Sequence, residues 1–594
     1  MTDYYDNGGA ESINQNVHVD HHNLGIIIDS DNTFRIYLGT DGGIFYTNSS
    51  KDPGVVDNDF KVSGKTSNNW YQPAGGYNTT QFYGADKVVG YDQYFGGSQD
   101  NGTFLSPRNL IADETTTWSF EIGGDGFEAI AHHTDPNKLI GGSQGNNFYR
   151  STNGGASWSY AQYGLEGADP FITRLSSPAQ DPDVLYAVTN FGVMKSNDFG
   201  QSWQAKQVEG NWNSSFWSGT DVEVSLANPR YVWAGSSMSF AGNIFLSKDW
   251  GETYESVPNF SSLGRTSGIY SHPTEDSTAY VLFGMPGEAK VLQTRDLGET
   301  WEDLSGFTNS NDGKSLNGFP DVPVYSFLVM PHDKDIMWAG TEVGLIESTN
   351  GGASWHLVES NLPYVTIWDL KLKDEGQIVI ATHGRGVWTA TIDDLKSYEP
   401  KPAILPPFIL SAYQLDSEDS YVISTNINTK SSYDSLVIKA NNVKRDVFQN
   451  VDKSDSTIFL FEVDDKGDYT IQAFGYKDGL EYPSNEYDII LNPTLQPRTE
   501  YSTTFSDLVG DEFGLDRFRI GIQGGFEGRQ LHTEHPYESG VAGGYDDGYS
   551  VHALLNIPII ITDYTPSIRF KEIVLVEPGE PGTSFGDWNF WDYV

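Results

Sequence analysis

Apolar and polar positions alternate in short runs along most of this chain, and the runs return in a fixed order. Residues 171–203 show that order: an apolar run at Phe171–Leu175, a polar turn, a second run at Asp181–Val188, a third run that begins at Gly192, and finally the aromatic residue Trp203. Alternation with a period of two, bounded by Gly, Pro and Asp, is typical of β-strands. A unit of about 45 residues with this order predicts one four-stranded sheet.

A short motif precedes the fourth run of these units. It reads Ser/Thr-x-Asp/Asn-x-Gly-x-Ser/Thr-aromatic, and its five copies start 45 to 54 residues apart. The carboxylate or amide can accept backbone N–H groups and close a turn, while the glycine supplies a positive φ. We therefore expect structural roles for the five turn residues: Asn153, Asp198, Asp249, Asp296 and Asn350.

Three further segments follow the same order without a complete motif. They are Phe34–Tyr46, Tyr94–Phe104 and Gln377–Trp388. Repeats of this period are typical of β-propellers, in which each repeat forms one blade. The count is eight units, and the sequence predicts an all-β chain with a seven- or eight-bladed propeller over residues 1–395.

The pattern changes after the propeller. Residues 396–407 are rich in proline, which is typical of a stiff linker. Residues 408–493 contain short alternating runs that predict an immunoglobulin- or fibronectin-like β-sandwich. Residues 498–594 alternate strand-like runs with loops rich in Gly and Pro, and we expect a jelly-roll-like domain there that is truncated.

The repeated motif resembles the Asp-box (BNR) repeat of sialidases, sortilin-type receptors and xyloglucanase-type glycoside hydrolases. This resemblance implies a propeller whose boxes are structural and lie on the rim, away from the ligand. Asp135–Gly142 and Thr382–Trp388 are similar to blade segments of the xyloglucanase-type enzymes, which act in a cleft between two propellers with one aspartate from each. The sequence predicts one ring only, so at most half of such a site is expected.

Two C-terminal segments, Leu531–Tyr537 and Val576–Gly586, resemble a jelly-roll module of large secreted proteins from gliding bacteria that use type IX sorting. The resemblance implies a secreted or cell-surface protein. We expect both ends of the chain to be cut from a longer protein, with a signal peptide lost by that truncation.

The net charge argues against some classes of partner, and the absence of cysteine excludes thiol chemistry. The chain has 81 acidic and 36 basic residues, a net charge of −45, and no cysteine. Such a surface repels nucleic-acid phosphates and anionic membranes, and no apolar run is long enough to insert into a bilayer. Disulfides, thiolate metal sites and cysteine nucleophiles are excluded.

Polar residues on the innermost strands of a propeller converge on its central channel. Four of these carboxylates are candidates for catalysis, because glycoside hydrolysis needs one carboxyl as an acid and another as a base or nucleophile: Asp86, Asp125, Glu128 and Asp369. The other interpretation is that they are solvated channel carboxylates without a chemical role.

Ligand-binding candidates are of two kinds. Arg174 and Arg265 fall at channel strands, and arginine binds carboxylates in a bidentate manner. Trp212 and Trp217 lie in a polar stretch, and we expect both rings to be exposed and available for stacking against sugars or for anchoring a peptide. Packing between blades is the alternative for the tryptophans of the boxes.

His18, Asp20 and His22 share one face if the segment is a strand, and imidazole with carboxylate suits zinc or a similar ion. A hydrogen-bonded structural cluster is the alternative. No cofactor is expected to be required, although acidic loops such as Gly544–Gly548 could hold Ca²⁺.

The sequence thus predicts a propeller that binds an extracellular polysaccharide or protein. Two alternatives remain open at this point. One is a xyloglucanase-like glycoside hydrolase that uses the channel carboxylates. The other is an adhesin-like structural protein of the cell surface.

Overall fold

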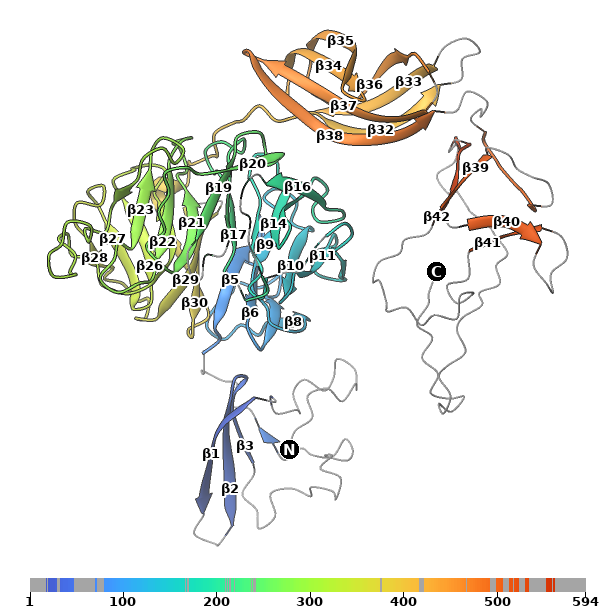
Figure 1. Ribbon diagram of the computed structural model, residues 1–594. Coiled ribbons are helices and arrows are strands. Elements are labelled where there is room, and N and C mark those ends of the chain that lie inside the picture. The colour runs from blue at the N-terminus through green and yellow to red at the C-terminus, as the bar shows by residue number, and fades with distance from the viewer. Residues whose placement is uncertain are drawn as a thin grey trace. The chain divides into compact units, whose positions relative to one another are not determined.

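A computed structural model gives the structure of the protein (Figure 1). It describes residues 79–505 almost continuously, together with parts of residues 18–71 and 512–560. Residues 1–17, 48–69, 72–78, 534–551 and 561–594, with shorter stretches between, lie outside the described part. The chain divides into two compact units, residues 1–403 and 404–594.

Seven blades of the first unit form a closed ring, which confirms the prediction of an all-β propeller (Figure 1). The outer strands of blades 3 and 4 pair in parallel, so these two blades share one eight-stranded sheet. Successive inner strands contact one another around the ring, and the last one contacts the first. The inner strands of blades 1–7 are β5 (Phe82–Lys87), β9 (Ala129–Ala131), β13 (Leu175–Ser176), β17 (Asp221–Val224), β21 (Thr266–Ser271), β25 (Val324–Val329) and β29 (Thr366–Leu372).

The remaining strands of each blade follow outward in chain order and pair antiparallel. The second strands are β6 (Tyr94–Ser98), β10 (Leu139–Ser143), β14 (Leu185–Thr189), β18 (Val232–Ser236), β22 (Ala279–Phe283), β26 (Met337–Thr341) and β30 (Gln377–His383). The third strands are β7 (Gly102–Leu105), β11 (Asn147–Ser151), β15 (Gly192–Ser196), β19 (Asn243–Ser247), β23 (Val291–Thr294), β27 (Gly344–Ser348) and β31 (Val387–Thr391). The outer strands are β8 (Ser119–Ile122), β12 (Ser159–Tyr160), β16 (Gln204–Val208), β20 (Thr253–Ser256), β24 (Glu302–Asp303) and β28 (His356–Leu357).

Backbone hydrogen bonds close the ring between blades 7 and 1. Gln81 forms an isolated antiparallel bridge with His383, and the N–H groups of Gly384 and Gly386 donate to the carbonyl of Thr80 at 3.1 and 3.3 Å. In the described part of the chain, blade 7 has three strands. The ring therefore contains seven of the eight units that the sequence pattern contains.

The remaining unit, the first in the chain, forms a separate sheet. Its strands are β1 (His21–Ile28), β2 (Phe34–Thr40), β3 (Gly43–Thr47) and β4 (Trp70–Tyr71), in that order. Every residue of β1 is exposed. This sheet has the strand order of a blade but is not inserted between any two blades of the ring.

The five motif copies adopt one hydrogen-bonding pattern. In the first copy, the N–H of Gly155 donates to Ser151 Oγ at 2.9 Å, and the N–H of Ser157 donates to Asn153 Oδ1 at 2.9 Å. The other four copies repeat both bonds at 2.8–3.0 Å. Each turn satisfies its own backbone donors, which is a structural role.

The aromatic residue of the motif packs between neighbouring blades. Trp203 and Trp355 are almost fully buried, and their indole N–H groups donate to carbonyls of the preceding blade, on Ala161 at 2.8 Å and on Leu304 at 3.0 Å. A ring of this size buries a large apolar area while its single donor finds an acceptor. The motif therefore joins each of these blades to the one before it.

The second unit contains two main sheets. One consists of β32 (Phe408–Leu415), β33 (Tyr421–Thr429) and β36 (Ser454–Val463); the other consists of β35 (Val443–Val451), β34 (Tyr433–Ala440), β37 (Gly467–Lys477) and β38 (Leu480–Leu491), in these spatial orders. Alternate residues of both sheets are buried. They form a two-layer arrangement (Figure 1).

Two small strand pairs follow these sheets. They are β39 (Phe513–Asp516) with β42 (His552–Leu555) and β40 (Phe518–Ile522) with β41 (Arg529–Thr533). Most of the segments on which the jelly-roll prediction depends, and the acidic loop Gly544–Gly548, lie outside the described residues.

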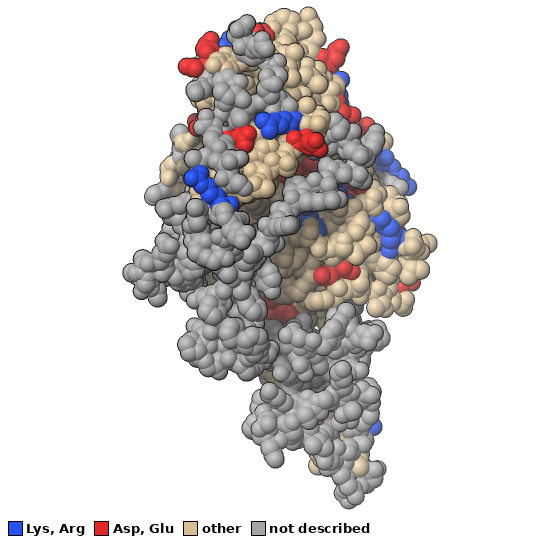
Figure 2. All heavy atoms as spheres, turned by 90° about the vertical axis from the view of Figure 1, so that its right-hand side faces the viewer, with Lys and Arg blue, Asp and Glu red and all other residues tan. Residues whose placement is uncertain are grey.

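Acidic and basic side chains are interspersed on the described surface that Figure 2 shows. No helix in the described part of the chain is long and apolar enough to cross a membrane. The excess of acidic over basic residues is a property of the whole sequence.

Candidate functional site

The seven inner strands begin at the same end of the central channel, which we call the mouth. Each inner strand runs antiparallel to its second strand, so the repeated motif, which follows the third strand, lies at the opposite end. In blade 2, for example, Ala129 at the start of β9 pairs with Gly141 near the end of β10, whereas Ser151 of the motif pairs with Leu139 at its start. The propeller thus has a motif face and a mouth face.

A network of buried charges fills the channel below the mouth. The ammonium group of Lys371 donates to Glu128 Oε1 at 2.5 Å and to the carbonyl of Ala129 at 2.9 Å. The second oxygen of Glu128 lies 3.7 Å from Arg174 Nη1. Glu128 is therefore paired with a second sequence candidate, Arg174, and with Lys371, which the sequence pattern did not single out.

Asp86 is neutralised in the same way. Its carboxylate lies 2.7 Å from Lys373 Nζ and accepts the N–H of Ala131 at 2.9 Å. Burial alone would raise the pKa of Asp86, but Lys373 and Lys371 outweigh that effect and hold the pKa below its usual value. A buried carboxylate with a lowered pKa and a lysine partner holds the strands together and is poorly placed to exchange protons with a substrate.

Asp369 is less completely satisfied. Its Oδ2 lies 3.5 Å from Lys371 Nζ and accepts no hydrogen bond from the described part of the chain. Burial raises the pKa of Asp369 to about 6, although Lys371 opposes the shift. Nearby on blade 4, burial raises the pKa of Glu223 to about 8, and this carboxyl accepts the hydroxyl and the N–H of Ser271 at 2.6 and 3.1 Å.

Asp125 lies apart from the other three catalytic candidates. It accepts the backbone N–H of Asp100 at 2.8 Å and donates its own N–H to Gln144 Oε1 at 2.8 Å. It braces the β6–β7 turn, where Asp100 has a positive φ of 63°. Burial and the neighbouring Asp125 raise the pKa of Asp100 to about 6. The structure thus brings Glu128 and Asp369 to one lysine, and places Asp86 and Asp125 with other partners.

The mouth itself carries a continuous chain of aromatic rings from six of the seven blades. Tyr325 stacks on Trp368 with ring centres 4.5 Å apart, and Trp368 contacts Tyr83 at 4.4 Å. The chain continues from Tyr83 to Phe127 at 5.1 Å and from Phe127 to Phe171 at 5.4 Å.

At blade 4, the row of aromatic rings becomes solvent-exposed. Phe171 contacts Phe216 at 5.5 Å and Trp217 at 5.3 Å, and 73 % of the Trp217 side chain is exposed. Phe127 is buried, and the rings of Tyr83, Tyr325 and Trp368 are half-buried. The mouth therefore presents aromatic surface that other side chains cover only in part.

Two buried nitrogen atoms in the rings at the mouth have no hydrogen-bond partner among the described residues. They are Trp368 Nε1 and His383 Nε2, which belong to rings 5.4 Å apart. Burial lowers the pKa of His383, which favours the neutral imidazole. Blade 5 contributes the exposed side chain of Arg265, whose charge acts on Tyr325. Partly uncovered aromatic faces and one exposed guanidinium group are thus available at this opening, whereas Trp368 Nε1 and His383 Nε2 are themselves buried.

The four ligand-binding candidates divide into two pairs. Trp217 is exposed, as the sequence predicts, and Arg265, which is expected at a channel strand, is exposed just before the inner strand β21. Trp212 differs from the expected exposure: its ring packs against Phe245 at 5.2 Å, and its N–H donates to the carbonyl of Thr189 at 3.0 Å. Trp212 fills the gap between blades 3 and 4, and Arg174 is buried in the channel.

The three metal-ligand candidates do not converge on one point. His18 Nε2 donates to the carbonyl of Asp100 at 2.8 Å, and its Nδ1 accepts the N–H of Asp20 at 3.2 Å, so both ring nitrogens are engaged. His22 instead pairs with Asp41. Carboxylate oxygens of Asp20, Asp41 and Asp100 do lie within 4.8 Å of one another, so the acidic group that could hold a cation differs from the predicted set.

Comparisons with known proteins give limited similarity. No family model matches the sequence. The oligoxyloglucan-reducing end-specific xyloglucanase of Emericella nidulans is 27% identical over 228 residues, which cover 34% of this chain and 28% of that enzyme. The matched region thus spans little more than a quarter of the length of this curated relative.

Two solved structures show the range of structural similarity. A GH74 xyloglucanase from Xanthomonas campestris has 16% identity and a TM-score of 0.40, over 60% of this chain and 48% of that one. YCF48 from Cyanidioschyzon merolae has 13% identity and a TM-score of 0.37, over 52% of this chain and 95% of that one.

Sequence reasoning missed the lysines of the channel and most of the aromatic mouth. Asp369 and Lys371 lie on β29 and Lys373 follows its last residue, Leu372; if the strand geometry continues by one residue, this alternation places all three on one face. That spacing could have indicated an ion-paired inner strand. Tyr83, Phe127 and Trp368 precede or begin inner strands, a position that the repeat pattern could also have indicated.

Proposed function

We propose that the protein is a carbohydrate-binding propeller and that a polysaccharide binds across the aromatic chain at the mouth. The single observation that carries the proposal is the continuity of that chain from Tyr325 to Trp217 across six blades. Sugar rings present apolar C–H faces that stack on aromatic rings, and their hydroxyls hydrogen-bond at the edges. The curated relative is named for its action on xyloglucan, which supports a glycan over other ligand classes.

The mouth offers groups that complement a neutral polysaccharide. Half-buried rings at Tyr83, Tyr325 and Trp368 surround the channel opening, and Trp217 extends the surface outward. The guanidinium group of Arg265, which is exposed at the same opening, can donate to hydroxyl groups. A protein ligand would use Trp217 as an anchor instead, and it is the competing partner of the same surface.

A glycoside hydrolase is the alternative function. Asp369 favours it, because a buried carboxyl with a pKa of about 6 can act as an acid near neutral pH. Against it, Asp86 and Glu128 are already paired with Lys373 and Lys371. A hydrolase needs a second free carboxyl that faces the same bond. Binding without cleavage is thus the better-supported function, with a surface adhesin as the least specific alternative.

The test uses a panel of soluble polysaccharides that includes xyloglucan, with affinity electrophoresis for binding and a reducing-end assay for cleavage. We expect retardation by at least one polysaccharide, no release of reducing ends, and weaker retardation in Trp217→Ala. Tyr160→Ala is the matched control, since Tyr160 is also 73 % exposed but lies on the outer strand β12. Cleavage that disappears in Asp369→Asn would establish the hydrolase instead, and retardation that Trp217→Ala leaves unchanged would disprove the mouth as the site.

The proposal also covers the identity of the motif, the C-terminal domains and the location of the protein. We infer that the five motif copies are Asp-boxes, because each adopts the same self-contained turn. The two-layer sheets of residues 408–491 suit an immunoglobulin-like spacer between the propeller and a jelly-roll-like domain. A secreted or cell-surface location, with type IX sorting, follows from the sequence resemblance and suits an extracellular glycan ligand.

A further inference from the structure

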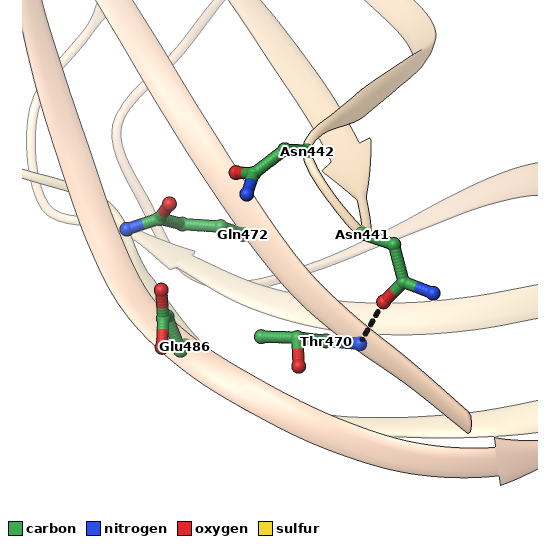
Figure 3. Close-up of a pocket in the computed structure, with 5 residues that line it drawn as sticks. All are labelled: Asn441, Asn442, Thr470, Gln472 and Glu486. Atoms are coloured by element: carbon green, nitrogen blue, oxygen red, sulfur yellow. Dashed lines mark hydrogen bonds between the residues drawn. The ribbon is translucent and has the colours of Figure 1, made fainter.

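A polar pocket of 340 Å³ lies on the four-stranded sheet of the second unit, in part of the chain that the propeller does not involve (Figure 3). Its lining comes from three places that are distant in sequence: the β34–β35 turn, strand β37 and strand β38. The five lining residues are Asn441, Asn442, Thr470, Gln472 and Glu486. Its volume falls in the range of ligand pockets, about 300–1,000 Å³.

The turn that forms one wall is fixed in place. Asn441 and Asn442 have φ values of 51° and 61°, the conformation of a two-residue hairpin turn that asparagine tolerates. Asn441 Oδ1 accepts the N–H of Thr470 at 2.8 Å, and its amide donates to the carbonyl of Asp468 at 2.9 Å. Asn441 thus positions the wall, and the adjacent amide of Asn442 is left to face a ligand.

The opposite wall is also ordered. Gln472 and Glu486 are directly paired across strands β37 and β38. The amide nitrogen of Gln472 donates to the carbonyl of Ser484 at 3.0 Å, which fixes the orientation of the side chain. Within the described residues, no hydrogen bond or ion pair is formed by the side-chain amide of Asn442 or by the carboxylate of Glu486. The pocket therefore combines held side chains with available polar groups (Figure 3).

The chemistry of the lining selects among ligand classes. A divalent cation needs several anionic oxygens, and only one of the five residues is a carboxylate. An anion would meet Glu486 without any cation in the lining, and an apolar ligand would meet no apolar side chain. Amide, hydroxyl and carboxylate groups together offer both donors and acceptors, which is what the vicinal hydroxyls of a sugar require.

We propose that this pocket binds one pyranose unit of a neutral oligosaccharide, with Asn442, Gln472 and Glu486 as the hydrogen-bonding residues. Asn441 and Thr470 act as positioning residues. Because Glu486 and both asparagines are exposed, the pocket is open to solvent and can accept a unit within a longer chain. This second site is independent of the proposed propeller site and could raise the avidity of the whole protein for a polysaccharide.

The experiment uses the full chain carrying Trp217→Ala, so that the propeller site is weakened first. Isothermal titration with cellohexaose, mannohexaose and a xyloglucan heptasaccharide as probes should show residual binding to at least one of them. Adding Glu486→Gln or Gln472→Ala should weaken that binding at least tenfold. Glu462→Gln, an exposed glutamate on a strand of the other sheet, is the matched control and should leave binding unchanged.

Three results would overturn the proposal: no neutral oligosaccharide binds the Trp217→Ala chain, pocket substitutions leave its binding unchanged, or the pocket binds only CaCl₂ or trigalacturonate. The two proposals fail separately. Loss of all binding in Trp217→Ala disproves the pocket and supports the mouth, whereas binding that resists Trp217→Ala and is abolished by Glu486→Gln disproves the mouth and supports the pocket. Far-ultraviolet circular dichroism of each variant confirms that the substitutions leave the sheets folded.

Discussion

The channel interior and the mouth of the propeller lie along one axis but differ in how completely their side chains are paired or covered within the protein. In the interior, carboxylates and cations from different blades are paired with each other: Asp86 with Lys373, and Glu128 with Lys371. At the mouth, aromatic rings remain partly uncovered, and Trp368 Nε1 has no partner among the described residues. Most of the interior charges are thus compensated within the protein, with Asp369 Oδ2 as an exception, whereas the aromatic surface of the mouth remains partly uncovered.

This difference matters for assigning function. Carboxylates near a channel invite a catalytic interpretation, yet here most of them are buried and neutralised by lysine. Buried pairs cost more to break than they contribute in attraction, because removal of one partner leaves a charge without solvent. A ligand contacts side chains that remain exposed in the free protein. At the mouth of the propeller, aromatic rings remain exposed or partly exposed.

The largest expected effect comes from removing the cation that two interior carboxylates share. Lys371→Met leaves Glu128 and Asp369 buried without it, and we expect a loss of about 3–5 kcal/mol in the free energy of unfolding. Guanidinium denaturation measures this loss. Lys396→Met is the control, because Lys396 pairs with the exposed Asp393 and should change stability little. Equal effects of the two substitutions would remove the distinction between interior and surface charge.

The next effect tests the interior through pH. Burial raises the pKa of Glu223 to about 8, so the folded protein holds a proton that the unfolded chain releases at lower pH. Stability from this group is full below its unfolded pKa and is lost as pH rises to about 8. We expect Glu223→Gln to reduce the loss of stability between pH 5 and pH 8 by about 3–4 kcal/mol relative to the unmodified chain. An unchanged pH dependence would show that Glu223 titrates normally.

A third substitution sharpens the comparison from the side of the mouth. Trp217→Ala should weaken polysaccharide binding about tenfold, equivalent to about 1.4 kcal/mol, with little change in the melting temperature. Trp212→Ala, five residues earlier, should lower the melting temperature because its ring packs between blades. Differential scanning fluorimetry and affinity electrophoresis separate the two. If both substitutions reduced stability equally, Trp217 would belong to the packing of the fold.

The smallest effect is expected at the motif face, which lies at the end of the propeller opposite the mouth. Asn153→Ala removes the acceptor of the Ser157 N–H and should cost about 1 kcal/mol of stability. Binding should be unaffected. Asn350→Ala removes the equivalent acceptor in the last copy and should give the same result. A loss of binding in either variant would indicate that the motif face contributes to the ligand site.

The sequence predicts features that depend on neighbouring residues and fails for those that depend on closure of the ring. The strand order of each blade, the motif turns and the exposure of Trp217 could all be predicted from local patterns. The pairing of Glu128 with Lys371 joins residues 243 positions apart, and no local signal specifies it. The different environments of Trp212 and Trp217 also depend on the neighbouring blade, since Trp212 packs against Phe245.

Closure at Thr80 and Gly384 separates the number of repeats in the gene from the number of blades in the ring. The seam combines backbone hydrogen bonds with apolar packing between blades 7 and 1, so both edges of the ring are already occupied. A repeat added before Thr80 would therefore leave a ring of seven intact and remain outside it, as the sheet β1–β4 does. Sequence changes in a repeat outside the ring would not disturb the hydrogen bonds that close it.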